Sequence, residues 1–250
     1  MAKETGLAAK AIVGGRDISG AVAALNTIEG RKTSLDITAI DKSAMERIQG
    51  QADGEMALAV WFDDATDEIH DAFKALPTAD VLFTYLQGQV LGNAAAAIVA
   101  KQINYAWTRG ADGGLAGTVQ ALANAFGLDW GVQLTTGVQT FTGAANTTGV
   151  RGKKTGSSTT HGLQAYIFCT AFTGTSVTAT IQESSDDGVG DAYAGVTGGA
   201  FAAISAVGAE RIATSKTQTV EEYLRVALTG TFNPADLTII VNVNQAAPTY

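Results

Sequence analysis

Residues that most often carry chemistry are scarce in this chain. Its 250 residues include one cysteine, Cys169, and two histidines, His70 and His161. A single cysteine excludes an intrachain disulfide, and its place in the alternating run 163–172 favours a small buried side chain over a nucleophile, which would need a neighbouring histidine-type base. The histidines belong to no HExxH-type motif, so solvated or structural roles are favoured. We therefore expect no catalytic residue and no enzymatic activity.

Metal and nucleotide sites are not indicated either. The acidic stretch 183–188 with Asp191 could gather oxygen ligands around calcium, but it lacks the EF-hand spacing, so a solvated turn is favoured. The glycines at 14, 15 and 20 form neither GxGxxG nor a P-loop. Asp63 and Asp64 could act as paired acids, although adjacent carboxylates before a helix are commonly caps or solvated charges. We expect no cofactor-binding residue and no metal-binding residue.

The chain also lacks long apolar runs and an excess of positive charge. No run approaches the roughly 20 apolar residues that span a bilayer, and the first five residues lack the apolar core of a secretory signal, so we expect no membrane segment and synthesis in the cytosol. The 16 basic and 24 acidic residues give a net charge of −8, which argues against tight binding to nucleic acid. The acidity is concentrated before residue 131, where 10 basic and 16 acidic side chains give −6.

Proline is scarce at 3 residues, whereas glycine is abundant at 29, which favours tight turns between β segments over a helical bundle. The hydrophobic content of 46% is enough for a large core in one large or two small domains. Alternation of apolar and polar residues predicts strands over 55–62, 81–86, 98–105, 163–172, 177–181, 223–228 and 237–243. We expect the first of these strands to follow a turn at Asp53 and Gly54.

One helix is predicted between two of these strands. Ile69, Ala72, Phe73 and Leu76 follow the spacing of one buried helical stripe, with Thr66 as N-cap and a proline at 77 as the stop. A capping-box spacing at residues 43 and 46 predicts a further short helical turn. The stretch 115–126 fits a helix or a strand on pattern alone.

A domain boundary is predicted between residues 130 and 161, where Thr, Gly, Ser and a basic cluster replace the apolar rhythm. Beyond residue 160 the short strands and Gly-rich turns predict a β-sandwich. Trp61, Trp107 and Trp130 could contact a second layer or a neighbouring subunit, with burial inside the domain as the alternative.

Several short segments resemble the major tail proteins, or tail tube proteins, of long-tailed bacteriophages and related prophages. These segments are residues 15–20, 35–38, 41–44, 53–54 leading into 61–62, 70–77, 104–105, 109–113 and 128–131. The resemblance implies a mainly β fold, a pair of packed sheets in a tail-tube-type sandwich or barrel with one flanking helix, and a strand over 115–126. Residues 173–175, 181–184 and 222–226 look like the extra C-terminal β domain of some such proteins.

The resemblance therefore implies a tail tube domain over 1–134 and a C-terminal β-sandwich domain over 135–250. The second domain would decorate the tube exterior, or it would be a diverged second tube domain; we favour the exterior domain because the second half lacks a comparable helix. The family's subunits form homo-oligomers, expected here as hexameric rings stacked into a tube, whose implied partners are a tape measure protein and tail terminator and distal tail proteins.

By the same resemblance the tube forms the phage tail of the virion and is assembled in the host cytoplasm. Edge-to-edge closure would remove exposed strand edges, and an acidic lumen would let DNA pass without specific binding. Residues 29–34 and 109–114 are expected to be loops that contact the next ring. The alternative functions are a carbohydrate- or host-surface-binding β-sandwich protein of the virion and a capsid or baseplate component.

Overall fold

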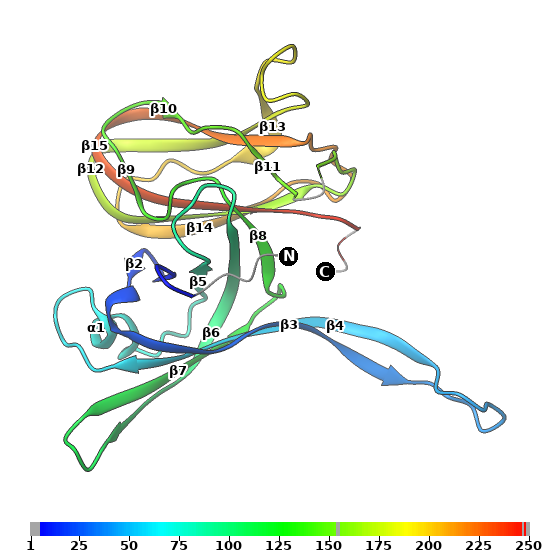
Figure 1. The fold of residues 1–250 in the computed structure, drawn as a ribbon, viewed down its shortest axis with the longest axis vertical. Helices are drawn as coiled ribbons and strands as arrows, with labels where there is room; N and C mark the ends of the chain where they lie inside the picture. The colour runs from blue at the N-terminus through cyan, green and yellow to red at the C-terminus, as the bar shows by residue number, and fades with distance from the viewer. Residues whose placement is uncertain (1–5, 154–155, 247, 249–250) are drawn as a thin grey trace.

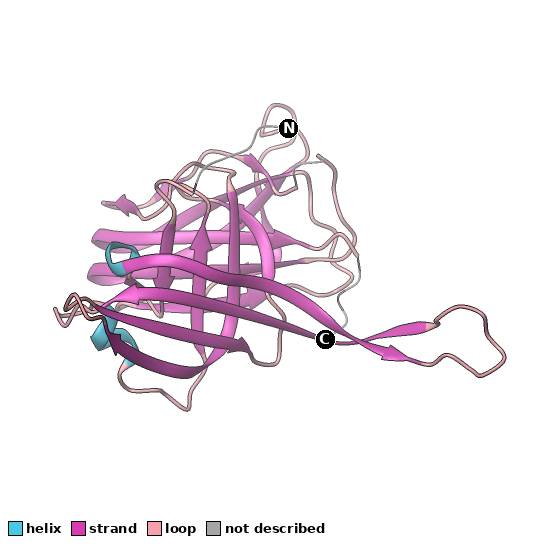
Figure 2. Cartoon of the chain, turned by 60° about the horizontal axis from the view of Figure 1, so that its bottom comes forward, coloured by secondary structure: helices cyan, strands magenta, loops and turns pink. Residues whose placement is uncertain are grey.

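The computed structural model describes residues 6–153, 156–246 and 248, and it is mainly β with one short helix (Figures 1 and 2). The elements of the first part are β1 (Lys10–Val13), β2 (Arg16–Asp17), the 3-10 turn Ser19–Ala21, β3 (Val22–Asp36), β4 (Arg47–Trp61), α1 (Ile69–Phe73), β5 (Val81–Leu86), β6 (Ala94–Arg109), β7 (Leu115–Ala123) and β8 (Asp129–Gln133). Then follow β9 (Gln139–Phe141), β10 (Ala145–Asn146), β11 (Val150–Arg151), β12 (Leu163–Ser184), β13 (Ala194–Ala200), β14 (Gly208–Ala213) and β15 (Tyr223–Val243). The predicted mainly β fold is confirmed.

The first half of the chain forms two sheet layers that share strand β6. One layer, which we call the open sheet, has the order β3-β4-β7-β6 and uses the second half of β6. The other layer runs β2-β1-β5-β6-β8 and uses the first half of β6. Every one of these pairings is antiparallel. A strand of 16 residues can serve both layers because it is long enough to pass from one sheet to the other.

A first hydrophobic core fills the space between these two layers. Its buried side chains come from β1, β4, β5, β6, β7 and α1, and they include Met56, Leu58 and Val60 on alternate positions of β4. Residues on one face of a strand recur every second position, so the intervening residues of β4 point to the other face of the open sheet. The helix closes one side of this core, where the Phe73 ring stacks on Phe83 with 5.9 Å between ring centroids.

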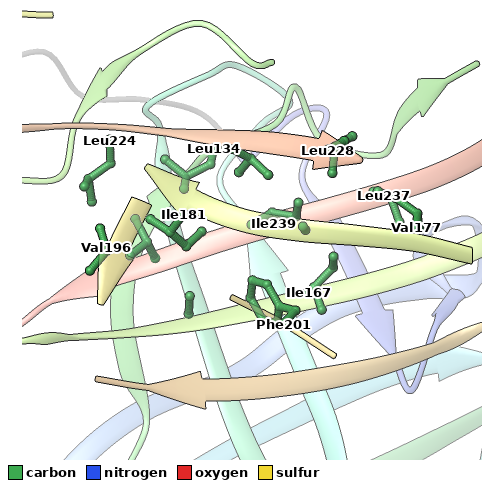
Figure 3. Close-up of a cluster of buried hydrophobic side chains, with 14 of the residues drawn as sticks. Leu134, Ile167, Val177, Ile181, Val196, Phe201, Leu224, Leu228, Leu237 and Ile239 are labelled. Carbon is green, nitrogen blue, oxygen red and sulfur yellow. The ribbon is translucent and has the colours of Figure 1, made fainter. Parts of the chain in front are cut away.

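The second half of the chain is built on one long ribbon. Strands β12 and β15, of 22 and 21 residues, pair along nearly their whole length. The pairing register shifts between Cys169 and Ser176. Bulges at these positions bend the ribbon, so that the part before the bend faces the part after it. The resulting β-sandwich encloses a second core whose members include Ile167, Ile181 and Ile239 (Figure 3).

The two halves meet through a third buried cluster. It joins Ile12, Leu86 and alternate alanines of β6 to Tyr166, Phe168 and Ile240 of the long ribbon. Strand β8 also pairs with both β6 and β15. The layers therefore follow in a fixed order from the open sheet, through the β1-β5-β6-β8 layer, to the ribbon sandwich (Figure 1).

The predicted helix exists but is shorter than expected. It spans Ile69–Phe73, with Ile69 and Phe73 fully buried, whereas Leu76 lies beyond it and is 47% exposed. The prediction of Thr66 as N-cap was wrong because Glu68 occupies that position, without a side-chain capping bond. Asp67 has φ of +65°, so the chain cannot be helical from Thr66 onward. The helical turn expected at residues 43–46 is also wrong, since those residues form an irregular loop.

Several predicted turns and loops are strand in the structure. Asp53 and Gly54 lie inside β4 and do not precede it, and residues 29–34 lie inside β3. The pairs of strands predicted over 163–172 and 177–181, and over 223–228 and 237–243, are continuous in β12 and β15. The strand at 81–86 is confirmed, as is the strand interpretation of the stretch from 115, which forms β7. No helix among the described residues is long and apolar enough to cross a membrane.

Candidate assembly surface

The residues weighed as catalytic candidates are scattered through the fold. Cys169 is fully buried in the second core, and burial, together with the smaller influence of the Asp236 carboxylate, raises the pKa of its thiol to about 11. His70 in α1 has its Nδ1 2.8 Å from the Tyr105 hydroxyl, whereas the His161 carbonyl accepts a hydrogen bond from Asn244 in the other half. Within the described ranges, no group of three or more His, Cys, Asp or Glu side chains could hold a metal ion.

The acidic turn after β12 is occupied by its own backbone. Asp186 accepts hydrogen bonds from the backbone N–H groups of Val189, Gly190 and Asp191, and these bonds lower the pKa of its carboxyl. Asp191 accepts a further bond from the Ser185 backbone N–H. A carboxylate that caps several N–H groups stabilises a tight loop. The carboxylates of this segment therefore stabilise the turn through hydrogen bonds to its own backbone.

The open sheet has a free strand edge on each side. Strand β3 pairs only with β4 among the described residues, so its outer N–H and C=O groups are unpaired by other strands. On the opposite side, the second half of β6, from Gln102 to Arg109, pairs only with β7 within the same set of residues. Unpaired edges of this length invite pairing with another chain.

The face of the open sheet that points away from the core carries uncharged side chains, several of them small, between Glu55 and Trp61 of β4. The cross-strand partners Ala59, Thr118 and Ala106 form one row over β4, β7 and β6. Ala57 and Gln120 begin the next row. None of these five side chains belongs to the buried core clusters. We call this surface the open face.

A cluster of charges lies where the open face meets the projecting part of the hairpin. Arg31 is paired across the strands with Asp53, and the next cross-strand pair on the same face of the hairpin is Glu29 and Glu55. The Arg31 guanidinium contacts Asp53 at 2.8 Å, Glu29 at 3.1 Å and Glu55 at 3.6 Å. Hydrogen bonds to, and the charges of, Asp53 and Glu29 raise the pKa of Arg31, with Asp53 as the largest cause. One cation thus compensates three carboxylates.

The β3–β4 hairpin projects far beyond the rest of the molecule (Figures 1 and 2). Strand β4 pairs with β7 only from Glu55 to Trp61. The part of the hairpin between Gly30 and Gly54, which includes its tip, is therefore a two-stranded ribbon with no third strand beside it. We call residues 31–53 the arm. Five large apolar side chains of the arm are exposed: Leu35 (53%), Ile37 (51%), Ile40 (108%), Met45 (61%) and Ile48 (48%). An exposed apolar group on a ribbon that is marginal by itself is typical of a surface that binds a partner.

A polar cluster fixes the junction between the two halves. The Asp129 carboxylate accepts hydrogen bonds from the Tyr166 hydroxyl at 2.5 Å and from Asn242 Nδ2 at 3.1 Å, and Arg211 lies 3.8 Å away. The Arg211 guanidinium also lies over the Phe126 ring at 3.8 Å. Burial raises the pKa of Asp129, against the opposing influence of Tyr166 and Arg211. Buried carboxylates require such partners, so this cluster holds the halves in one orientation.

The three tryptophans differ in whether they are buried inside the chain or exposed to outside contacts. Trp61 and Trp130 are 54% and 49% exposed, and Trp107 is partly buried against the first core. The Trp107 ring contacts Tyr105 and Phe62 edge to face, with centroid distances of 5.1 and 5.0 Å. Trp61 and Trp130 are therefore available for contacts outside the domain.

No family model and no curated protein matches this chain. Among solved structures, the chain is similar to a virion protein of a native gene transfer agent particle, with TM-score 0.40, 11% identity, and coverage of 51% of this chain and 98% of that chain. It is also similar to the SPP1 Dit protein, described as a hub of the adsorption apparatus in phages that infect Gram-positive bacteria, with TM-score 0.33, 11% identity, and coverage of 94% and 98%.

A third similar structure belongs to the phage p2 baseplate in its activated conformation with strontium, with TM-score 0.35, 11% identity, and coverage of 96% of this chain and 99% of that chain. Because these TM-scores and identities are low, we base the proposed function on the geometry of the chain itself.

Proposed function

We propose that this chain is a structural subunit of a phage tail, whose copies join edge to edge into rings that stack into the tail tube. The observation that carries this proposal is the antiparallel open sheet, which combines two free edges with a face whose central rows are uncharged. A sheet with an unpaired edge on each side can pair head to tail with identical copies until the ring closes.

Strand direction favours this pairing. Each of the steps β3-β4, β4-β7 and β7-β6 is antiparallel, so β6 runs opposite to β3. In a ring of identically oriented copies, β3 of one copy would therefore lie antiparallel to β6 of the next copy. The continuous barrel would keep one pairing pattern through every subunit boundary.

The channel that results depends on the number of copies. Six copies would supply about 24 strands, which at about 4.8 Å spacing and about 40° tilt give a backbone diameter of about 48 Å and, after about 5 Å for side chains on each wall, a clear width of about 38 Å. Three copies would leave only about 14 Å by the same calculation, which is too narrow for a DNA duplex. Between these two assemblies, each counted with one four-stranded sheet per copy, we propose the hexamer because its channel would admit a duplex.

The arm is the proposed contact between neighbouring subunits or rings. Its apolar side chains at Ile37, Ile40 and Met45 would become buried against another copy. The turn between β6 and β7, around Gly110 to Gly114, lies at the far end of the same sheet and is the second proposed ring contact. Both are placed where the barrel strands end.

The order of layers supports an outer position for the second half. If the open face lines the channel, the β1-β5-β6-β8 layer lies behind it and the ribbon sandwich lies farthest from the axis. We therefore keep the division into a tube domain, residues 1–134, and an exterior domain, residues 135–250, as a proposal. The two main cores change over a few residues before this boundary, with Leu128 as the last contributor to the first core and Val132 as the first contributor to the second.

In this proposal the subunit acts in the virion, after assembly in the host cytoplasm, and performs no reaction. Its partners would be further copies, a tape measure protein inside the tube, and tail terminator and distal tail proteins at its ends. The similar structures are described as a virion, an adsorption hub and a baseplate. A hub or baseplate role would use the same edge pairing but would end at a single ring.

Negative-stain electron microscopy of the purified chain over a range of concentrations tests this proposal. We expect rings at intermediate concentration and hollow filaments at high concentration. A chain that is monomeric throughout that range, or that forms only closed shells, would refute the tube function; single rings that never stack would assign the chain to a hub.

A further inference from the structure

Arg31 is held by carboxylates on each of its exposed nitrogens. One Asp53 oxygen accepts a hydrogen bond from Nε at 3.0 Å and lies 2.8 Å from one terminal nitrogen, and Glu29 accepts a hydrogen bond from the other terminal nitrogen at 3.1 Å. Glu55 lies 3.6 Å from that same nitrogen and is fixed in turn by a hydrogen bond from Gln120. The guanidinium fork that would otherwise suit a phosphate is thus occupied from two sides.

This arrangement is not required to stabilise a hairpin. Glu29 and Glu55 are direct cross-strand partners, and like charges opposite one another destabilise a sheet. The side chains of Arg31 and Glu29 are 42% and 48% exposed, where ion pairs contribute little to stability. Asp53 and Glu55 are 35% and 15% exposed, so they lie closer to the sheet than Arg31 and Glu29 do. The repulsion between the two glutamates points to a role for the charges in the surface that they create.

We propose that Glu29, Asp53 and Glu55 shield Arg31 from polyanions, so that the open face presents a latent phosphate site that stays closed to the DNA backbone. This inference rests on the proposed function, because the cluster would face the channel. Net acidity alone reduces the concentration of DNA near a surface, but a free arginine can still hold a phosphate at short range through a bidentate contact. Three carboxylates around one guanidinium remove that contact and leave a local charge of −2.

The test is duplex DNA binding by the purified full chain, measured by fluorescence anisotropy over a range of low salt concentrations. The variant E29Q/D53N/E55Q keeps side-chain shape and unmasks Arg31. We expect it to bind duplex at least tenfold more tightly than the wild-type chain, with a steeper salt dependence. Adding R31Q should abolish the gain and reduce the salt slope by about one for each phosphate that the chain no longer binds.

A matched control separates shielding from net charge. The variant D63N/D64N/E68Q removes three carboxylates near α1, so the net charge changes by the same amount, from −8 to −5. We expect this control to bind DNA no better than the wild-type chain. Equal gains in the two triple variants, no gain in the first, or a gain that survives R31Q would each overturn the inference.

The milder variant D53N keeps the experiment decisive if the triple variant misfolds, which circular dichroism would show. It frees the bidentate side of Arg31 alone and should give a smaller gain that R31Q also removes. The readout does not depend on assembly, because it uses subunits at concentrations below ring formation. Failure to form tubes in the microscope would refute the proposed function, whereas failure of the DNA readout refutes the shielding.

Discussion

Replacing the apolar side chains of the arm tip by serine is the perturbation that separates assembly from folding. The variant I37S/I40S/M45S changes side chains that are 51%, 108% and 61% exposed. Surface substitutions of this kind change the free energy of unfolding by about 0.5 kcal/mol or less. The isolated subunit should therefore unfold at nearly the same temperature as the wild-type chain.

The effect on assembly is expected to be much larger. Full burial contributes about 2 kcal/mol for Ile40 and about 1 kcal/mol for each of the two half-exposed side chains, or about 4 kcal/mol for each arm contact. If half of this area is buried in the contact, the loss of about 2 kcal/mol weakens each contact about 30-fold. Because a tube requires many such contacts, filaments should disappear at concentrations where the wild-type chain forms them.

Analytical ultracentrifugation combined with electron microscopy measures this loss. The control variant L76S/V189S/V207S removes three apolar side chains that are 47%, 89% and 51% exposed but lie outside the arm. It should assemble like the wild-type chain. Filaments of the arm variant at the wild-type threshold concentration, or equal loss in both variants, would refute the role given to the arm.

Three further outcomes follow from the packing within the chain. Gly131→Ala would place a Cβ against the Val241 carbonyl oxygen, closer than the two atoms can approach without a backbone shift. Thermal unfolding should show a free energy of unfolding lowered by about 3 kcal/mol. The control Gly143→Ala meets nothing within 4 Å, so its free energy of unfolding should fall by less than about 0.5 kcal/mol. The Cys169 thiol, whose pKa burial raises to about 11, should not react with a thiol reagent at neutral pH until the chain is unfolded. Burial raises the folded-state pKa of Asp129, so the protonated carboxyl favours the folded chain. This stabilisation is complete below the ordinary carboxyl pKa and is lost as pH rises through the folded-state pKa. The free energy of unfolding in urea should therefore fall over this pH range in the wild-type chain, and the D129N variant should lack that fall.

The fold class and several strands could be predicted from the sequence because they rest on local alternation. Residues 81–86 alternate and form β5 with the same bounds. The helix at Ile69 and Phe73 was predicted because its two buried residues have helical spacing. Its end was misjudged, since Leu76 fits the stripe but has φ of +41° and points to solvent. Local spacing cannot show which member of a stripe reaches the core.

The arm could not be predicted because its signals point elsewhere. Asp53 and Gly54 are a common turn pair, and Ser43 and Glu46 have capping-box spacing, so both favour local structures that the hairpin overrides. The cross-strand pairing between β3 and β4, which continues along the whole of both strands, outweighs those preferences. Exposed apolar residues such as Ile40 would ordinarily count as core, and only the folded structure shows that nothing covers them within the chain.

The side-chain sizes along β6 explain how one strand serves three environments. Ala95, Ala97 and Val99 face the cluster shared with the second half, while Ala96, Ile98 and Ala100 face the first core. A strand that is buried on both faces reads as a continuous apolar run, as it does here, and not as alternation. From Ala100 the same strand pairs with β7 in the open sheet, and beyond the bulge between Gln102 and Asn104 it places Ala106 beside Thr118 on the free face. The stretch that anchors the second half is therefore continuous with the edge that is proposed to bind the next subunit, so in the proposed tube the barrel would carry the outer domain directly.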